Sequence, residues 1–187
     1  MTLEEVNRLG RNEFVSRFGS VFESSPWAAE EAWRERPFGG FSELHEAFVR
    51  AMRGAPQERR MDLIRAHPDL AGKAAVAGEL TPESKGEQAS AGLDRLTPEE
   101  YEAFTRMNAD YRERFGFPMI VCVREHTRES ILQNAESRLE NSREEEVEVA
   151  LGEIAKIARL RLHDLVEADP GEENRATSSK EVEDDRD

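Results

Sequence analysis

Residues able to carry acid–base chemistry occur at two places in this sequence of 187 residues. In the stretch RAHPDLAGK, His67 stands directly before Pro68 at the end of a helical pattern. Glu87 shares one face of an expected helix with Ser84 and Gln88, among small residues that allow a ligand to approach closely. A histidine that titrates near neutral pH and a carboxylate can exchange protons with a substrate. Taken singly, each feature also fits an ordinary role, as a helix-end histidine or a solvated polar face.

An arginine interrupts the apolar face of the longest expected helix. Arg161 falls between Ala158 and Leu165 on a face that begins at Val147. A buried guanidinium is costly unless an anion meets it. Three explanations stay open: a structural ion pair, a side chain that reaches solvent at the edge of the face, or an anion-binding group whose planar fork suits a carboxylate.

The elements that must position these residues are expected to be almost all helical. Capping boxes begin helices at Thr2, Thr97 and Ser142. The helix from Thr97 should stop at Gly116, and the one from Ser142 should continue to about Val166. No regular strand alternation is present, so the fold class is predicted to be all-α, a compact multi-helix single domain. Further helices are expected over residues 41–52, 56–66, 82–96 and 127–140.

One segment breaks the helical pattern. The stretch FGFPMIVCV, Phe115–Val123, is apolar and rich in β-branched residues. Pro118 restrains Phe117 to extended geometry, so the preceding helix cannot continue through it. The segment is either a connection within the core or a buried, strand-like stretch whose backbone groups face a ligand.

Composition limits the class of protein. Charged residues make up 35% and hydrophobic residues 37% of the chain, as in a water-soluble globular domain. The net charge of −14 disfavours a nucleic-acid or membrane partner, and no apolar run approaches the ~20 residues of a membrane span. With Cys122 as the single cysteine and no secretory pattern, we expect a cytoplasmic location. The four histidines lack metal-ligand spacing, so no metal site is expected.

The chain from Glu167 onward differs from the rest. It carries nine acidic and three basic residues, no aromatic residue, and Val182 as its one β-branched apolar residue. Such a segment cannot bury enough apolar area to offset the entropy of ordering. We therefore expect a helical domain over residues 1–166 and a disordered acidic tail over residues 167–187.

Four motifs follow one another in order: HPDLAGK, ESKGEQASAGLD, FGFPMIVCVRE and EIAKIARLRLHDLV. Together they closely resemble the 2-oxo-4-hydroxy-4-carboxy-5-ureidoimidazoline (OHCU) decarboxylase family of urate degradation, from about Leu9 to Val166. The resemblance implies an all-helical, cofactor-free homodimer. It also implies a carboxy-lyase that converts OHCU to (S)-allantoin and carbon dioxide, with no nucleic-acid or membrane partner.

The same resemblance assigns roles to individual residues. His67 and Glu87 match the family's catalytic histidine and glutamate, and we expect His67 to act as proton donor with assistance from Glu87. Positions that contact substrate in the family match Pro68, Ser84, Lys85, Gly86, Glu87, Gln88, Met119, Ile120, Val121, Cys122, Val123 and Arg161.

The sequence departs from the family's pattern at three positions. Lys85 and Gly86 stand where the family has a threonine–arginine pair, and Met119 stands where a larger apolar residue is common. These changes concern the fit of the substrate more than the type of reaction. Two alternatives therefore remain: a related lyase or hydrolase acting on a different ureide, and a non-catalytic helical module that binds a protein partner.

Overall fold

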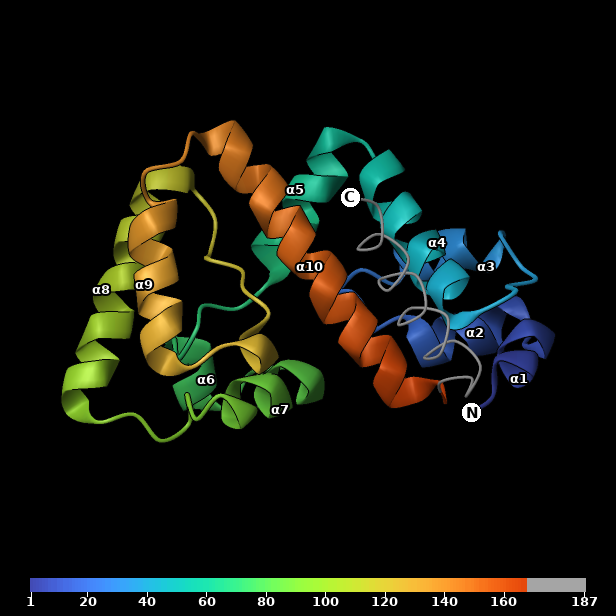
Figure 1. Ribbon diagram of the computed structural model, residues 1–187, viewed down its shortest axis with the longest axis horizontal. Coiled ribbons are helices and arrows are strands. Elements are labelled where there is room, and N and C mark those ends of the chain that lie inside the picture. Colours follow the sequence, from blue (N-terminus) through green and yellow to red (C-terminus); the bar gives the residue numbers. More distant parts are fainter. Residues whose placement is uncertain (168–187) are drawn as a thin grey trace, which may run out of the picture. The chain divides into compact units, whose positions relative to one another are not determined.

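The computed structural model describes residues 1–167, so the expected acidic tail lies, apart from Glu167, outside the described residues. Over this range the chain forms ten α-helices, one 3₁₀ turn and no strand (Figure 1). The predicted all-α fold class is confirmed. None of the helices in residues 1–167 combines the length and apolar character needed to cross a bilayer.

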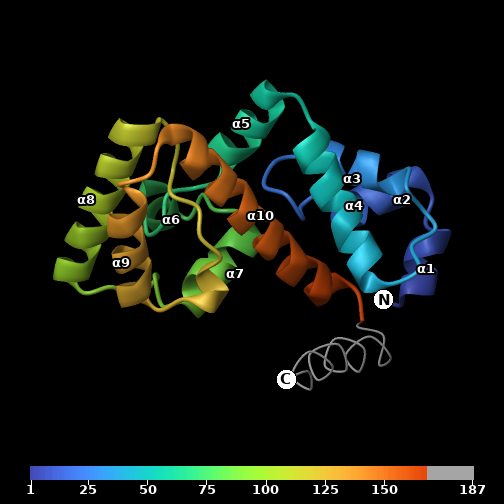
Figure 2. The same cartoon turned by 45° about the horizontal axis from the view of Figure 1, so that its top comes forward.

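The described residues group into two compact units. The first comprises Met1–Val21, Ser25–Gly54 and the described residues from Ala158 onward, 158–167. Its helices α2, α3 and α4 pack against one another, and they lie together in both Figure 1 and Figure 2. The core of this unit contains stacked and tilted aromatic rings, among them Phe14, Phe18 and Phe48, which are fully buried. Its helices are α1 (Leu3–Arg8), α2 (Arg11–Phe18), α3 (Trp27–Trp33) and α4 (Phe41–Gly54).

The second unit comprises Phe22–Ser24 and Ala55–Ile157. Within it, α8 and α9 run side by side (Figures 1 and 2), and α7 contacts the 3₁₀ turn η1. The helix α10 (Arg143–Leu165) contributes to both units. The other elements are α5 (Gln57–Ala66), α6 (Lys73–Ala77), α7 (Pro82–Ser90), α8 (Pro98–Phe115), η1 (Val123–Glu125) and α9 (Arg128–Arg138).

The predicted helix boundaries are confirmed at the capping boxes and at one glycine stop. Thr2 and Thr97 each accept a hydrogen bond from the backbone three residues on, and the glutamate at that position bonds back to the cap. Ser142 exchanges the same pair of bonds with Glu145. The helix α8 ends at Gly116, which adopts the left-handed conformation at φ 77°. Capping chemistry therefore determines these boundaries locally.

One predicted helix is shorter than expected, and two short helices were not predicted. The helix expected over residues 82–96 ends at Ser90, because Ala91 leaves helical geometry and Gly92 takes φ 73°. The short helices α3 and α6, of seven and five residues, were not foreseen. Segments this short make few periodic repeats, and tertiary packing rather than propensity stabilises them.

The interruption predicted after α8 is confirmed. Residues 117–122 form neither helix nor strand, and Phe117 and Val121 are buried. The five residues Met119–Val123, hereafter the 119–123 segment, have exposed fractions between 1% and 6%. This places an irregular stretch of backbone in the interior, where its polar groups require partners.

Candidate active site

His67 lies at the C-terminal end of α5, where Pro68 holds it in extended geometry with ψ 139°. Its side chain is 7% exposed, and its Nδ1 lies 2.9 Å from the carbonyl oxygen of Leu63. A carbonyl can only accept, so Nδ1 carries the proton. In the neutral form of the imidazole the basic lone pair is then on Nε2, and the hydrogen bond to Leu63 fixes the ring orientation.

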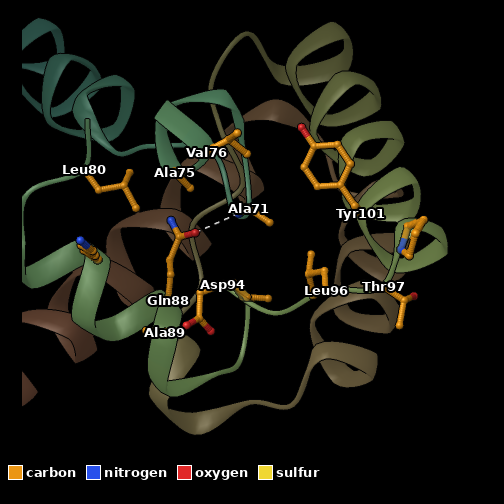
Figure 3. A pocket seen from close by; sticks show the side chains of 13 residues that line it. Ala71, Ala75, Val76, Leu80, Gln88, Ala89, Asp94, Leu96, Thr97 and Tyr101 are labelled. Atoms are coloured by element: carbon orange, nitrogen blue, oxygen red, sulfur yellow. Dashed lines mark hydrogen bonds between the residues drawn. The ribbon is translucent and has the colours of Figure 1, made fainter. Parts of the chain in front are cut away.

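Gln88 of α7 holds the loop that follows His67. Its Oε1 accepts a hydrogen bond from the N–H of Ala71 at 2.9 Å, and its Nε2 donates to the carbonyl of Asp69 at 3.3 Å. Figure 3 shows the first of these bonds. Ala71 adopts a left-handed conformation, φ 49°, which is uncommon for a residue with a side chain. The buried amide of Gln88 thus stabilises a strained turn next to the histidine.

The helix α8 holds the same loop from another direction. Asn108 donates from Nδ2 to the carbonyl of Leu70 at 2.8 Å, and Arg112 donates from Nε to the carboxylate of Asp69 at 2.8 Å. A Cβ on Gly72 would lie 2.7 Å from the Cβ of Asp69, so the close turn requires glycine. The loop that follows His67, residues 68–72, is therefore held rigidly and supports the position of His67.

Ser84, one turn before Glu87 on α7, donates a hydrogen bond to a carboxylate that the sequence did not reveal. Its Oγ lies 2.9 Å from Oε2 of Glu23, and both side chains are buried. Nothing in the spacing links positions so far apart in the chain, so pattern analysis could not detect the pair. Glu23 follows the apolar pair Val21 and Phe22 but precedes two serines, so its sequence context gave little signal of a buried carboxylate.

The remaining predicted residues of α7 differ in exposure. Lys85 and Gly86 are exposed, and the position of a Cβ on Gly86 meets open space. Glu87 is half-buried, and its charge contributes to the raised pKa of Cys122. Together with the contact between α7 and η1, this brings Glu87 into the neighbourhood of the 119–123 segment. The structure thus associates Glu87 with that segment within one unit.

Two charged side chains bind the backbone of the 119–123 segment. Arg138 donates from Nη1 to the carbonyl of Ile120 at 2.8 Å, and Oε2 of Glu153 accepts from the N–H of Cys122 at 2.7 Å. Burial raises the pKa of the Cys122 thiol to about 11, and the nearby charges of Glu125 and Glu153 add to the effect. Cys122 is consequently a neutral, weakly nucleophilic thiol at physiological pH.

Arg161 is 5% exposed, so the interpretation that it reaches solvent at the edge of the helix face is wrong. Its Nη1 donates to the carbonyl of Ser20 at 3.0 Å. Arg161 and Ser20 belong to the first unit, whereas the other predicted site residues belong to the second. The assignment of Arg161 to the same site as His67 stays a prediction.

A cavity of about 610 Å³ lies beside the predicted substrate-contacting stretch of α7. Gln88 and Lys85 line it, as do Val76 and Tyr101, the large apolar side chains that are exposed in the described chain. Figure 3 shows Leu96, Thr97 and Tyr101 on one side of it and Leu80 on the other. Its volume is that of a small-molecule pocket. His67 and Glu87, the two residues predicted to be catalytic, do not line this cavity.

Fold and sequence comparison define the class of protein, an all-α carboxy-lyase domain. The chain belongs to the OHCU decarboxylase family, whose model matches residues 7–163. It is 44% identical over 162 residues to the OHCU decarboxylase of Haloferax volcanii, covering 87% of this chain and 94% of that protein. It is 42% identical over 165 residues to the OHCU decarboxylase of Halalkalicoccus jeotgali, covering 88% and 92%.

A solved structure supports the same fold. The crystal structure of an (S)-allantoin synthase superimposes with a TM-score of 0.69 at 27% identity, covering 89% of this chain. The present chain spans 54% of that protein's chain, so the likeness concerns one part of it. The resemblance found in the four sequence motifs is thereby confirmed at the level of family and fold.

Proposed function

We propose that this chain decarboxylates OHCU to (S)-allantoin and carbon dioxide in urate degradation, with His67 and Glu87 as its acid–base pair. Family membership supports the reaction. The observation that carries the residue assignment is the buried His67, whose Nδ1–H is engaged by Leu63 and whose loop is held by Gln88 of the helix bearing Glu87. Such an arrangement presents one basic nitrogen in one orientation.

The substrate's own chemistry explains the small set of residues. OHCU has a carbon bearing both a hydroxyl and a carboxylate next to a ring C=N bond. When the bond to the carboxylate breaks, its electron pair forms a C=C bond, the nitrogen of the former C=N bond takes up a proton, and an enol-like intermediate remains. The hydroxyl then loses its proton to become a carbonyl, and the neighbouring carbon gains a proton. The enzyme must position the carboxylate, stabilise the intermediate and deliver that proton to one face.

In this proposal His67 and Glu87 share the proton transfers. Nε2 of His67 hydrogen-bonds the substrate hydroxyl and then serves as proton donor or acceptor. Glu87 pairs with the histidine or with the hydroxyl and sets which of them is charged. Acid–base assistance of this kind typically contributes ~10²–10⁴-fold in rate.

The 119–123 segment supplies backbone hydrogen-bonding groups to the ring and ureido groups. Support comes from Val121, which is buried and whose N–H and C=O form no hydrogen bond within residues 1–167. Buried backbone groups are almost always paired, so these are suited to a ligand. Ser84 can still accept a hydrogen bond while its proton is donated to Glu23.

The remaining parts of the proposal are carried by resemblance to the family. Arg161 binds an anionic or carbonyl oxygen of the substrate, for which its planar fork is suited. The enzyme acts as a cytoplasmic homodimer. Light scattering coupled to size-exclusion chromatography tests the dimer, because it separates a mass near twice 21.3 kDa from the monomer mass.

Circular dichroism in the near ultraviolet tests the reaction. OHCU is generated freshly from urate with a urate oxidase and a hydroxyisourate hydrolase, and the protein is then added. We expect fast appearance of the (S)-allantoin signal, against slow drift to the racemate without protein. An unchanged drift would contradict the assignment, and a panel of other ureides would then test the altered-substrate alternative suggested by Lys85 and Met119.

A further inference from the structure

We propose that Arg138 and Glu153 are positioning residues that hold the backbone of the 119–123 segment on both sides of Val121, so that the backbone groups of Val121 face the substrate. This inference rests on the proposed function, because it concerns how that site is assembled. Neither residue is among the positions predicted to contact the substrate. Both are buried, with exposed fractions of 7% for Arg138 and 9% for Glu153.

Arg138 binds the segment and also forms a buried ion pair with Glu146. Its Nε donates at 3.0 Å to Oε1 of Glu146, a carboxylate with no exposed surface, while its Nη1 donates to the carbonyl of Ile120. Tyr111 donates to the same oxygen of Glu146, and Asn141 donates to the other at 2.9 Å. The guanidinium therefore has little freedom, because its partner is held by two further donors. The carbonyl of Ile120 is bound to a rigid group.

Glu153 binds the backbone of the segment two residues later, at Cys122. Its Oε2 accepts from the N–H of Cys122, and its Oε1 accepts at 2.7 Å from Nζ of Lys156, one turn further along α10. Hydrogen bonding to this carboxylate raises the pKa of Lys156. A carboxylate that accepts a backbone N–H makes a stronger bond than a neutral acceptor does. The N–H of Cys122 is thus fixed by a charge-assisted hydrogen bond from the longest helix.

The two anchored residues flank Val121 in the chain. Ile120 and Cys122 are alternate residues, and both are bound by charged side chains of the helices α9 and α10. Val121 lies between them, and neither its N–H nor its C=O has a hydrogen-bond partner within residues 1–167. The anchors therefore fix the backbone on both sides of Val121, whose N–H and C=O remain for a ligand.

Three substitutions separate positioning from simple stabilisation. Glu153→Leu removes the acceptor for the N–H of Cys122 while keeping a similar volume. Glu153→Gln removes the charge but keeps a carbonyl oxygen in place. Lys156→Met is the matched control, because it removes the ion pair with Glu153 and leaves the bond to Cys122 intact. For the other anchor, Arg138→Lys keeps a cation for Glu146 but cannot also reach Ile120 with a fork.

The single cysteine of the chain provides a readout that needs no substrate. The thiol of Cys122 is 1% exposed, so its reaction with an aromatic disulfide reagent reports opening of the segment. Loss of the negative charge alters the thiol equally in Glu153→Leu and Glu153→Gln, so the difference between these two variants isolates the hydrogen bond. We expect the thiol of Glu153→Leu to react about tenfold faster than that of Glu153→Gln. Lys156→Met should react at nearly the wild-type rate.

Kinetics supply the second readout. We expect kcat/KM for OHCU to fall about 10²-fold in Glu153→Leu, mainly through KM, with substantial recovery in Glu153→Gln and none lost in Lys156→Met. Arg138→Lys should lower kcat/KM in the same way while its circular dichroism spectrum stays that of a folded helical protein. A purely structural role would lower the melting temperature and leave the KM of the folded enzyme unchanged.

The two readouts distinguish failure of the inference from failure of the proposed function. Equal thiol reactivity in Glu153→Leu and Glu153→Gln, or an unchanged KM in both Glu153→Leu and Arg138→Lys, overturns the positioning role. If the wild-type protein does not turn over OHCU, the proposed function fails. The thiol rates then still decide whether the segment is held by Glu153.

Discussion

The hydroxyl of Ser84 donates a hydrogen bond to the carboxylate of Glu23 at 2.9 Å, across 61 positions of the sequence. The bond links the predicted substrate-contacting helix α7 to a short connection that precedes α3. Since both side chains are buried, loss of either leaves a polar group in the interior with one hydrogen bond fewer. Ser84 therefore stabilises the position of α7 and is also a predicted substrate contact.

Replacing Ser84 by alanine should destabilise the protein. Removal of the hydroxyl deprives the buried carboxylate of Glu23 of a donor, which costs about 1–3 kcal/mol in free energy of unfolding. Urea denaturation measures the loss. Ser90→Ala is the matched control on the same helix, because the exposed hydroxyl of Ser90 donates only to a carbonyl of its own helix. A loss as small in Ser84→Ala as in Ser90→Ala would contradict the importance of the bond.

Substitution of His67 should abolish the reaction without unfolding the protein. His67→Asn retains a side-chain N–H near the position of Nδ1, so the bond to the Leu63 carbonyl can persist while Nε2 is lost. We expect kcat to fall by ~10²–10⁴-fold in this variant, and decarboxylation by His67→Ala to be undetectable. The melting temperature of His67→Asn should stay close to that of the wild type. Turnover at the wild-type rate in either variant would exclude His67 from the mechanism.

Glu87→Gln should lower activity with little change in stability. The side chain is half-buried, and the amide preserves its shape while removing its charge and its ability to take up a proton. A fall in kcat of ~10²-fold or more is expected in the circular dichroism assay. Glu83→Gln, one turn earlier on α7, is the control for a charge change on this helix and should remain active. Equal activity of the two variants would remove Glu87 from the acid–base pair.

The buried thiol of Cys122 should make stability fall at alkaline pH. Its pKa is raised from the ordinary value of 9.0 to about 11, so the folded state keeps the proton in a range where the unfolded state loses it. The stabilisation is complete below about pH 9 and disappears as pH rises to about 11, a change of roughly 2 kcal/mol in free energy of unfolding. Comparing wild type with Cys122→Ala across this range isolates the effect. An identical pH dependence in both proteins would contradict it.

Much of the fold followed from local chemistry in the sequence. The capping boxes at Thr2 and Thr97 and the stop at Gly116 involve neighbouring residues, so their boundaries could be predicted. Pro118 likewise forced the break that begins the 119–123 segment. The short helices and the early end of α7 depend on packing between distant parts of the chain, which no local pattern encodes.

The site was predictable only in part, for the same reason. His67 and Glu87 could be proposed as catalytic residues because they lie in motifs that resemble the family's, and that assignment stays a prediction. Glu23 and Glu153 bond to residues far along the chain, and although Glu153 begins the motif EIAKIARLRLHDLV, neither spacing nor residue type distinguishes the two from the other acidic residues among forty. Burial distinguishes them from solvated carboxylates, and burial of a polar residue comes from the three-dimensional arrangement.

The burial of Arg161 leaves two interpretations open, a structural ion pair and an anion-binding group. Substitutions of Arg161 distinguish them. Arg161→Lys keeps the positive charge but loses the planar fork, so a substrate-binding role predicts a KM raised about 10-fold or more with a nearly unchanged melting temperature. Arg161→Ala should weaken substrate capture further. Arg159→Ala is the control, because Arg159 is exposed on the same helix and lies over the ring of Phe41. If the Arg161 variants lose only thermal stability and keep the wild-type KM, the guanidinium is a structural element of its unit and the substrate's anion is bound elsewhere.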